Sequence, residues 1–265
     1  MKICMAGACG RMGRRILELA VTEDGVEIGG AFDVPDVVGT ELVVGSEGRR
    51  PQQVLVSADP AAEIARADVL IDFTIAGACV DNARVAADAA KPAVIGTTGL
   101  SDEQAAELRA LGKRIPIVYA PNMSVGVNVL FKLTREVAGI LGLEYNVEIA
   151  EVHHNLKKDS PSGTAVHLAR QAAEALGLDY AADAIHGREG LIGERPVRQI
   201  GVHALRGGDV VGEHTVSFIG KGERVEITHK AHSRDNFARG ALRAARFAVQ
   251  AQPGVYDMQD VLGLK

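Results

Sequence analysis

The densest group of chemically capable residues is the segment 151–165, which reads EVHHNLKKDSPSGTA. It holds two adjacent histidines, two lysines and a Pro-Ser-Gly-Thr helix start. Histidine gives or takes a proton near neutral pH, and the free N–H groups at a helix start bind anions. The segment therefore predicts a site that holds an anionic substrate and supplies it with a proton.

Within this segment the two histidines are expected to do different work. Neighbouring residues of a strand point to opposite faces, so His153 and His154 cannot both face one ligand from a strand. Gly163 and Thr164 bring free N–H groups to the helix start, and Lys157 adds a full positive charge. A carboxylate-bearing substrate would fit this pocket.

A zinc site and a purely structural histidine pair are the alternatives for the same segment. Two adjacent histidines lack the i, i+4 spacing of a helical HExxH motif, and the segment offers no cysteine partner. We therefore expect no metal. A histidine that only satisfies the core remains open for either position.

A glycine-rich loop near the start of the chain is the second candidate site. Gly7, Gly10 and Gly13 form GxxGxxG after an apolar run and before a helix that begins near Arg11, where N–H groups can face a pyrophosphate. Twenty residues further on, Asp33 can accept hydrogen bonds from an adenosine ribose. A tight strand-to-helix turn, with Asp33 as a turn residue before Pro35, is the alternative.

Two further groups of small residues follow later apolar runs. Residues 96–99 read GTTG and residues 120–123 read APNM. Both would lie at the carboxyl ends of strands, where an open α/β sheet places its ligand, and would let a nicotinamide approach the backbone. Simple connecting turns are the alternative.

The elements that must position these residues begin with a βαβ pattern over the first 120 residues. Ser101, three residues before Gln104, predicts a capped helix that runs to Leu111 and stops at Gly112. The expected strands of the parallel sheet are 2–6, 26–32, 54–56, 69–73, 93–95 and 117–120.

After Asn122 the pattern changes, and a second domain is expected. A helical face repeats every four residues from Val125 to Leu141, and residues 145–149 alternate like a strand. Residues 200–230 predict an antiparallel meander with a turn at 220–222. Ser233 is expected to cap an alanine-rich helix that packs back on the first domain. All eight histidines lie between His153 and His232.

We therefore predict a Rossmann-type parallel-sheet domain, residues 1–122 plus 235–265, for dinucleotide binding. An inserted α+β domain, residues 123–234, with an open mixed or antiparallel sheet, would bind substrate and form subunit contacts. This α/β architecture brings the glycine loop and the histidine segment into one enzyme.

Composition narrows the function classes further. The 265 residues carry a net charge of −5 and only 4% aromatics, which disfavours nucleic-acid binding. No apolar stretch is long enough to span a membrane, and the N-terminal segment lacks the long apolar core of a signal peptide. The three cysteines match neither a disulfide framework nor a metal pair. We expect a soluble cytoplasmic protein.

The motifs together resemble the dihydrodipicolinate reductase family, which acts in lysine and diaminopimelate biosynthesis. The resemblance covers nearly the whole chain: GACGRMGR, GTTG, APNMSVGVN, EVHHNLKKDSPSGTA, RGGDVVGEHTVSF and GERVEITHKAHSR. It implies NAD(P)H-dependent reduction of a small cyclic dicarboxylate to tetrahydrodipicolinate, and a homotetramer.

The resemblance also implies roles for individual residues. His153 and Lys157 would be the acid groups of the reaction. The substrate carboxylates would contact His154, Lys157, Gly163 and Thr164. NADH or NADPH would be held by Gly7, Ala8, Cys9, Gly10, Arg11, Met12, Asp33, Gly96, Thr97, Thr98, Ala120, Pro121, Asn122 and Met123.

One departure from the family bears on the cofactor. Members that favour NADPH often carry an arginine directly after the ribose acid, where this chain has Val34, Pro35 and Asp36. Two other functions remain open beside the reductase. One is another NAD(P)-dependent dehydrogenase of an amino or semialdehyde acid, and the other is a non-catalytic NAD(H)-sensing module.

Overall fold

The computed structural model describes residues 1–45 and 51–265 of the chain. The chain divides into two compact units. The first comprises Met1–Val125 together with Arg234–Lys265, and the second is Gly126–Ser233. Each unit is described by itself below.

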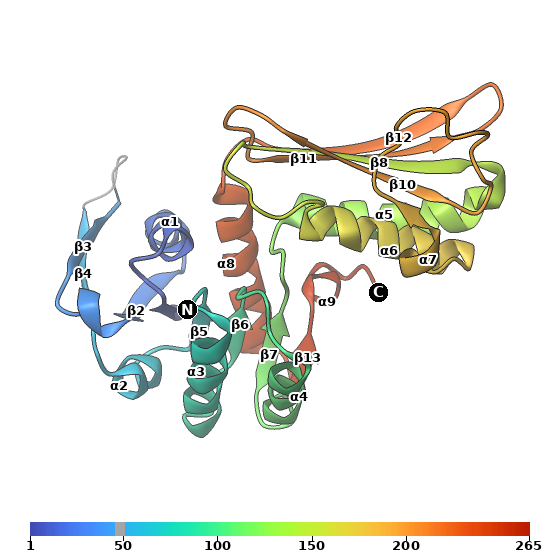
Figure 1. The fold of residues 1–265 in the computed structure, drawn as a ribbon. Coiled ribbons are helices and arrows are strands. Elements are labelled where there is room, and N and C mark those ends of the chain that lie inside the picture. The colour runs from blue at the N-terminus through green and yellow to red at the C-terminus, as the bar shows by residue number, and fades with distance from the viewer. Residues whose placement is uncertain (46–50) are drawn as a thin grey trace. The chain divides into compact units, whose positions relative to one another are not determined.

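The first unit is built on a six-stranded parallel sheet (Figure 1). The order across the sheet is β13-β7-β6-β5-β1-β2, and every neighbouring pair is parallel. The strands are β1 (Lys2–Ala6), β2 (Glu27–Phe32), β5 (Val69–Asp72), β6 (Ala93–Ile95), β7 (Pro116–Tyr119) and β13 (Gly254–Tyr256). This arrangement confirms the predicted Rossmann-type sheet.

Helices cover both faces of this sheet, because alternate residues of each strand enter opposite cores. Ile3 and Met5 of β1 join a core that includes residues of α1 and α8, whereas Cys4 joins a core that includes residues of α3 and α4. The helices of this unit are α1 (Arg11–Ala20), α2 (Pro60–Ala65), α3 (Ala76–Asp88), α4 (Asp102–Leu111), α8 (Asp235–Gln250) and α9 (Met258–Leu262).

The helix ends test the predicted start signals. The capping box of Ser101 and Gln104 is present, and α4 ends at Leu111 with Gly112 at its C-cap, as predicted. The predicted cap of α8 is wrong. Its N-cap position is Arg234, without a capping side-chain hydrogen bond among the described residues, so Ser233 lies one residue too early.

A second correction concerns the predicted strand at 54–56. The chain there forms β4 (Gln52–Leu55), which pairs antiparallel with β3 (Glu41–Val44) outside the six-stranded sheet. Of its four residues, QQVL, only Val54 is buried, which is typical of a largely exposed hairpin strand and not of a buried parallel one. Its link to β2 is an isolated bridge between Phe32 and Ser57.

The second unit carries a five-stranded sheet in the order β12-β11-β8-β10-β9, with α5 and α6 along one face (Figure 1). Its strands are β8 (Asn146–His153), β9 (Ala184–Ile185), β10 (Ile200–Arg206), β11 (Gly212–Ile219) and β12 (Arg224–Ala231). Its helices are α5 (Val125–Leu141), α6 (Gly163–Leu176) and α7 (Tyr180–Asp183). Short 3₁₀ turns lie at Pro35–Val37 in the first unit and at Gly142–Glu144 here.

The predicted antiparallel meander over 200–230 is only half correct. β11 and β12 form the expected hairpin, but β10 is parallel to β8, and β8 lies between β10 and β11. The connection after β10 crosses the end of β8 instead of turning back. Three backbone hydrogen bonds hold it there, Gly207 N to His153 O, His154 N to Val210 O and Asn155 N to Gly208 O. The sheet is therefore mixed.

Candidate active site

His153 is the last residue of β8 and lies on the buried face of the second sheet. The residues of β8 alternate in burial, and His153 follows Val147, Ile149 and Glu151 on the face toward the helices. Only 9% of His153 is exposed, and its Nδ1 lies 2.5 Å from Glu151 Oε2. One ring nitrogen is thus already committed to a carboxylate.

Glu151 is fully buried and accepts three hydrogen bonds from two partners besides the histidine. Arg206 donates two hydrogen bonds, at 2.7 Å to Oε2 and 2.9 Å to Oε1, and the Ser162 backbone N–H donates to Oε1 at 2.9 Å. Burial by itself would raise the pKa of Glu151, but the hydrogen bonds from His153 and Arg206 outweigh it and lower the pKa to about 2. Glu151 is therefore an ionised group inside the core.

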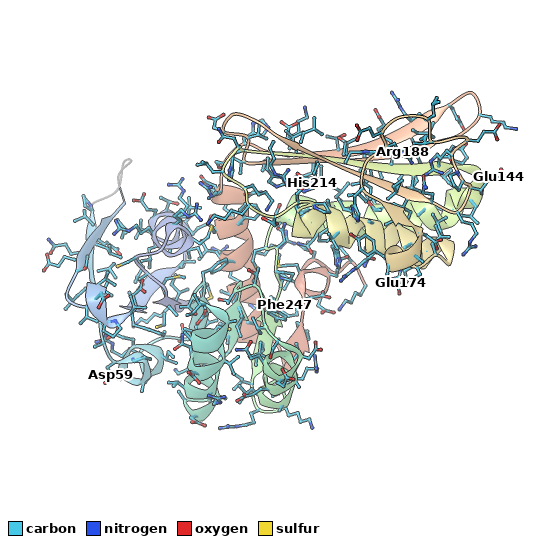
Figure 2. All side chains as sticks on the ribbon, in the orientation of Figure 1. Asp59, Glu144, Glu174, Arg188, His214 and Phe247 are labelled. Carbon is cyan, nitrogen blue, oxygen red and sulfur yellow. The ribbon has the colours of Figure 1, made fainter. Side chains whose placement is uncertain are left out.

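A second buried histidine, His214 of β11, completes this group (Figure 2). Its Nε2 lies 3.1 Å from Ser162 Oγ, and its ring meets that of His153 edge to face, with 5.1 Å between centroids. Burial, followed by the charge of His153, lowers the pKa of His214 to about 3. The side chain is consequently neutral at physiological pH.

The predicted anion pocket lies just beyond β8. Ser162 is the N-cap of α6 and accepts from the Ala165 N–H, so the helix starts at Gly163 as the sequence predicts. Thr164 lies in its first turn and is partly exposed. Lys157 pairs with Asp159, with 2.9 Å between Nζ and Oδ1. His154 is partly exposed, and its buried Nδ1 has no hydrogen-bond partner within residues 1–45 and 51–265.

In the first unit the backbone of the glycine loop is packed so closely that side chains at Gly7, Gly10 and Gly13 would contact neighbouring backbone atoms. Gly7 has a φ of +78°, and its N–H donates to Phe32 O at 3.0 Å. A Cβ on Gly13 would lie 2.0 Å from Gly7 O, and one on Gly10 3.2 Å from the same atom. The first turn of α1 is thus pressed against the loop, with Gly10 at the N-cap and Arg11 exposed beside it.

Asp33 reaches this loop from the end of β2. Its Oδ2 accepts from the Cys9 N–H at 2.7 Å, and its Oδ1 accepts from the Val34 N–H at 2.8 Å. A closely packed backbone, a helix N-terminus and a carboxylate at the end of the adjacent strand are the features a dinucleotide needs. The residues therefore fit NADH or NADPH, including Ala8 and Met12 of the same loop.

The other predicted cofactor residues follow β6 and β7 at the same edge of the sheet. Thr97 donates to Asp72 Oδ1 at 3.0 Å, and a Cβ on Gly96 would lie 2.3 Å from the Phe73 ring. Thr98 follows directly. After β7 come Ala120, Pro121, Asn122 and Met123, of which the first and last are buried. Asn122 Oδ1 accepts from the Ser124 N–H at 2.9 Å.

Sequence reasoning assigned no role to several residues that hold these groups. In the second unit they are Glu151, Ser162, Arg206, Gly212 and His214. In the first unit the buried carboxylate of Asp72 binds Thr74, Thr97 and Asn82. The sequence signal for Asp72 is an acid at the end of an otherwise apolar strand, VLID. A carboxylate buried there must be compensated by hydrogen bonds.

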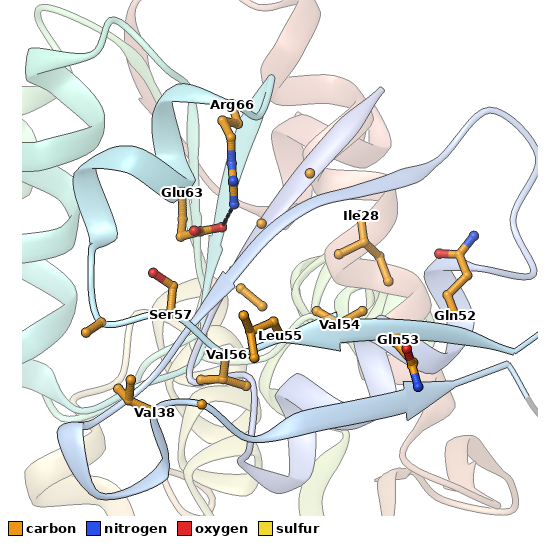
Figure 3. A pocket seen from close by; sticks show the side chains of 15 residues that line it. Ile28, Val38, Gln52, Gln53, Val54, Leu55, Val56, Ser57, Glu63 and Arg66 are labelled. Carbon is orange, nitrogen blue, oxygen red and sulfur yellow. Dashed lines mark hydrogen bonds and ion pairs between the residues drawn. The ribbon is translucent and has the colours of Figure 1, made fainter.

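A cleft of about 530 Å³ lies beside β2, lined by residues 28–31 and 52–58 with Val38, Gly39, Glu63 and Arg66 (Figure 3). Glu63 and Arg66 form an ion pair within it. None of the predicted cofactor or substrate residues lines this cleft. Elsewhere in the described chain, no group of three or more His, Cys, Asp or Glu side chains is arranged to hold a metal ion. None of the described helices is long and apolar enough to cross a membrane.

Comparison with known proteins places this geometry in a family. Residues 1–123 match the family model for the N-terminus of dihydrodipicolinate reductase, and residues 126–262 match that for its C-terminus. The 4-hydroxy-tetrahydrodipicolinate reductases of Citrifermentans bemidjiense and Geobacter sulfurreducens are 52% and 51% identical to the chain. Both alignments cover all of this chain and 100% and 99% of the relatives.

A solved structure has the same fold. The dipicolinate-bound dihydrodipicolinate reductase from Paenisporosarcina sp. TG-14 superposes with a TM-score of 0.79 at 22% identity, covering 98% of each chain. The matched family models span both units, and the full-length relatives agree with them. The chain therefore belongs to the dihydrodipicolinate reductase family.

Proposed function

We propose that this enzyme reduces 4-hydroxy-tetrahydrodipicolinate to tetrahydrodipicolinate with NADH or NADPH, in the biosynthesis of lysine and diaminopimelate. The observation that carries the proposal is the segment 151–165. In it the buried His153 is hydrogen-bonded to the Glu151 carboxylate and is followed, a few residues later, by Lys157 and the N-terminus of α6. Full-length relatives about half identical to the chain bear the name of this reductase.

The cofactor would be bound by the first unit, through Gly7, Asp33 and the loops after β6 and β7. The nicotinamide supplies a hydride, which is a proton with two electrons, when it is bound. The loops after β6 and β7 then serve to orient its ring. Asp72 fixes the first of these loops through Thr97.

The substrate would be bound by the second unit, with its carboxylates on His154, Lys157, Gly163 and Thr164. The 4-hydroxyl group must leave as water, which gives the conjugated dihydrodipicolinate ring. One hydride and one proton are then added to this ring, and His153 would donate the proton. The imidazolium loses its N–H bond, the substrate gains the proton, and solvent then restores the imidazolium. Lys157 stabilises the charge that develops and is the second candidate donor.

We further propose that NADH is used at least as well as NADPH. Asp33 repels a 2′-phosphate, and the residues that follow it up to Gly45 include no lysine or arginine. Arg49, the next such residue, lies outside the described residues. Arg11, exposed in the glycine loop, is the nearby cation that could favour NADPH. A kcat/KM with NADPH ten times or more above that with NADH would contradict this proposal.

The proposal includes a homotetramer in the cytoplasm. The edge strand β12 is exposed along much of its length, and apolar side chains such as Leu191 and Leu205 are exposed in the same unit. An exposed strand edge and apolar surface favour association with other subunits. The thiols of Cys4, Cys9 and Cys79 are free, as suits a reducing compartment.

The decisive test is a spectrophotometric assay in which substrate generated enzymatically is coupled to oxidation of NADH and of NADPH in parallel. We expect turnover with both substrate and cofactor present and none when either is omitted. Turnover of an aspartate-derived semialdehyde instead would favour another dehydrogenase. Tight cofactor binding without turnover of any of these acids would favour the sensing module.

A further inference from the structure

We propose that Glu151, held by Arg206, is a positioning residue that fixes His153 with its proton on Nδ1 and leaves Nε2 as the atom that exchanges a proton with the substrate. This inference rests on the proposed function, in which His153 is the proton donor. It adds which atom acts and which two residues determine that choice.

The tautomer follows from the partners of Glu151. An ionised carboxylate only accepts hydrogen bonds, so the ring nitrogen 2.5 Å from Oε2 must carry the hydrogen. Arg206 and the Ser162 N–H also donate to this carboxylate. The pKa of about 2 is that of a carboxylate which stays ionised wherever the enzyme works. Nδ1 therefore keeps its proton whether the ring is neutral or charged.

Gly212 leaves space beside Nε2, the other ring nitrogen of His153. A Cβ on Gly212 would lie 2.9 Å from His153 Nε2, closer than a carbon and a ring nitrogen pack. A residue with a side chain at this position, where β11 begins, would crowd the nitrogen that is left for the substrate. Glycine keeps that nitrogen unblocked from this side.

Arg206 connects the same carboxylate to the loop that carries Lys157. Its Nη2 donates to Asp159 O at 2.7 Å as well as to Glu151 Oε1, and Asp159 pairs with Lys157. The Arg206 guanidinium thus binds both the carboxylate that holds His153 and the loop that carries Lys157. This link explains how two groups four residues apart can be held in a constant relation.

The charged and titratable groups around His153 decide the direction of a pH effect. Glu151 comes from its own strand, Arg206 from β10, His214 from β11, and Lys157 and Asp159 from the following loop. His214 is neutral, because burial lowers its pKa to about 3. Removing the Glu151 charge leaves Arg206 and the Lys157–Asp159 ion pair, so the positive charge of Arg206 is no longer balanced and disfavours the imidazolium, whereas removing the Arg206 charge favours it.

The first experiment compares pH profiles of kcat/KM for Glu151→Gln and Arg206→Met in the full chain. We expect Glu151→Gln to lower kcat roughly tenfold or more, since an orienting partner is lost. Its alkaline limb should move to lower pH by about one unit or more, and that of Arg206→Met to higher pH. NADH affinity should stay unchanged in both.

Glu148→Gln is the matched control. Glu148 lies three residues earlier on the opposite face of β8 and also binds two arginines and a histidine, Arg188, Arg195 and His203. Its pKa is likewise about 2, because hydrogen bonds from Arg188 and His203 outweigh the effect of burial. We expect Glu148→Gln to lower stability without moving the pH profile of kcat/KM. If Glu151 had only a structural role, Glu151→Gln would behave in the same way.

The second experiment is independent of turnover. We expect ¹⁵N NMR of the wild-type protein without substrate, with His153 assigned by His153→Gln, to show a protonated Nδ1 and a bare Nε2 above the titration of the ring. A proton on Nε2 in the neutral ring would overturn the inference even if the enzyme is active. So would an unmoved pH profile in folded Glu151→Gln. Absence of turnover in the wild type would refute the proposed function, while the NMR result still decides the tautomer.

Discussion

The imidazole of His153 is hydrogen-bonded to Glu151 through Nδ1, and Nε2 is the atom proposed to act on the substrate. The effects of substitutions on catalysis can therefore be separated from their effects on stability. Glu151 and His214 contact the ring, Arg206 binds Glu151, and Lys157 belongs to the loop that follows β8. Substitutions at these positions should therefore affect different kinetic constants.

Replacing the proposed donor tests the site most directly. His153→Gln should lower kcat by roughly 10²-fold to 10⁴-fold, the range for a lost general acid, with little change in NADH affinity. Steady-state kinetics and NADH fluorescence titration measure the two effects. A folded variant with nearly wild-type kcat would transfer the role to His154 or to a bound water.

Lys157→Ala should damage both KM and kcat, because the ammonium is proposed to bind a carboxylate and to stabilise developing charge. The double variant with His153→Gln should cost much less than the product of the single losses, since both groups act in one step. A full product of losses would show two independent roles.

Thr164→Val tests the carboxylate pocket at the start of α6. The change removes a hydroxyl and keeps the shape, so we expect a penalty of about 1 to 3 kcal/mol in substrate binding, visible chiefly as a higher KM. The cofactor site should be untouched. If KM stays the same and NADH binds less tightly, Thr164 belongs to the other site.

At the scale of the element, β8 carries a buried or half-buried carboxylate on each face. Glu148 and Glu151 are three residues apart, so they point in opposite directions, and each meets arginine and histidine side chains. His214 on the adjacent β11 is buried without a charge. These three groups make the second unit sensitive to acid.

The free energy of unfolding should fall as the pH falls, in two overlapping ranges. The unfolded chain protonates His214 below its ordinary pKa of 6.5, but the native protein does not until about 3, so stability is lost between these values. Glu148 and Glu151 add a loss between 4.5 and about 2. Urea unfolding between pH 7.5 and 4 measures the decline.

His214→Gln isolates the upper range. It should flatten the dependence between pH 6.5 and 4.5 and leave the steeper loss at lower pH, which belongs to the two carboxylates. A wild-type stability that does not change between pH 7 and 5 would contradict the proposed burial of neutral His214.

Local signals in the sequence were sufficient for many of these elements, and non-local pairing was not. The capping box of α4 and the start of α6 at Gly163 depend on a few neighbouring residues, and both predictions are confirmed. The parallel pairing of β10 with β8 depends on residues more than fifty positions apart, and no local pattern distinguishes it from a meander.

The same limit applied to the site. The histidines and the lysine of the proposed site were chosen by residue type and spacing, but the residues that contact them could not be chosen in this way. Arg206 is 55 residues from Glu151, and His214 is 52 residues from Ser162. Both lie in the segment RGGDVVGEHTVSF, which carried the resemblance to the family without a role for any single residue.

At the scale of the whole molecule, the second unit leaves apolar side chains in contact with solvent. Leu191 is fully exposed, and Leu205 and Val225 are 52% and 39% exposed. We expect a tetramer with a mass of about 112 kDa, four times 27.9 kDa, by light scattering at micromolar concentration. A mass near 27.9 kDa would refute the assembly and leave the catalytic proposal intact.

The return of the chain to the first unit through α8 has a consequence for synthesis on the ribosome. Ala238, Ala241 and Leu242 of this helix, and Met258 and Val261 after it, belong to the same core as Ile3 and Ile71. The N-terminal segment therefore emerges long before the residues that complete its interior. We infer that the inserted unit can fold before the first unit is complete. A chain ending at Ser233 lacks both α8 and β13, and would expose part of one face of the remaining five strands to chaperones.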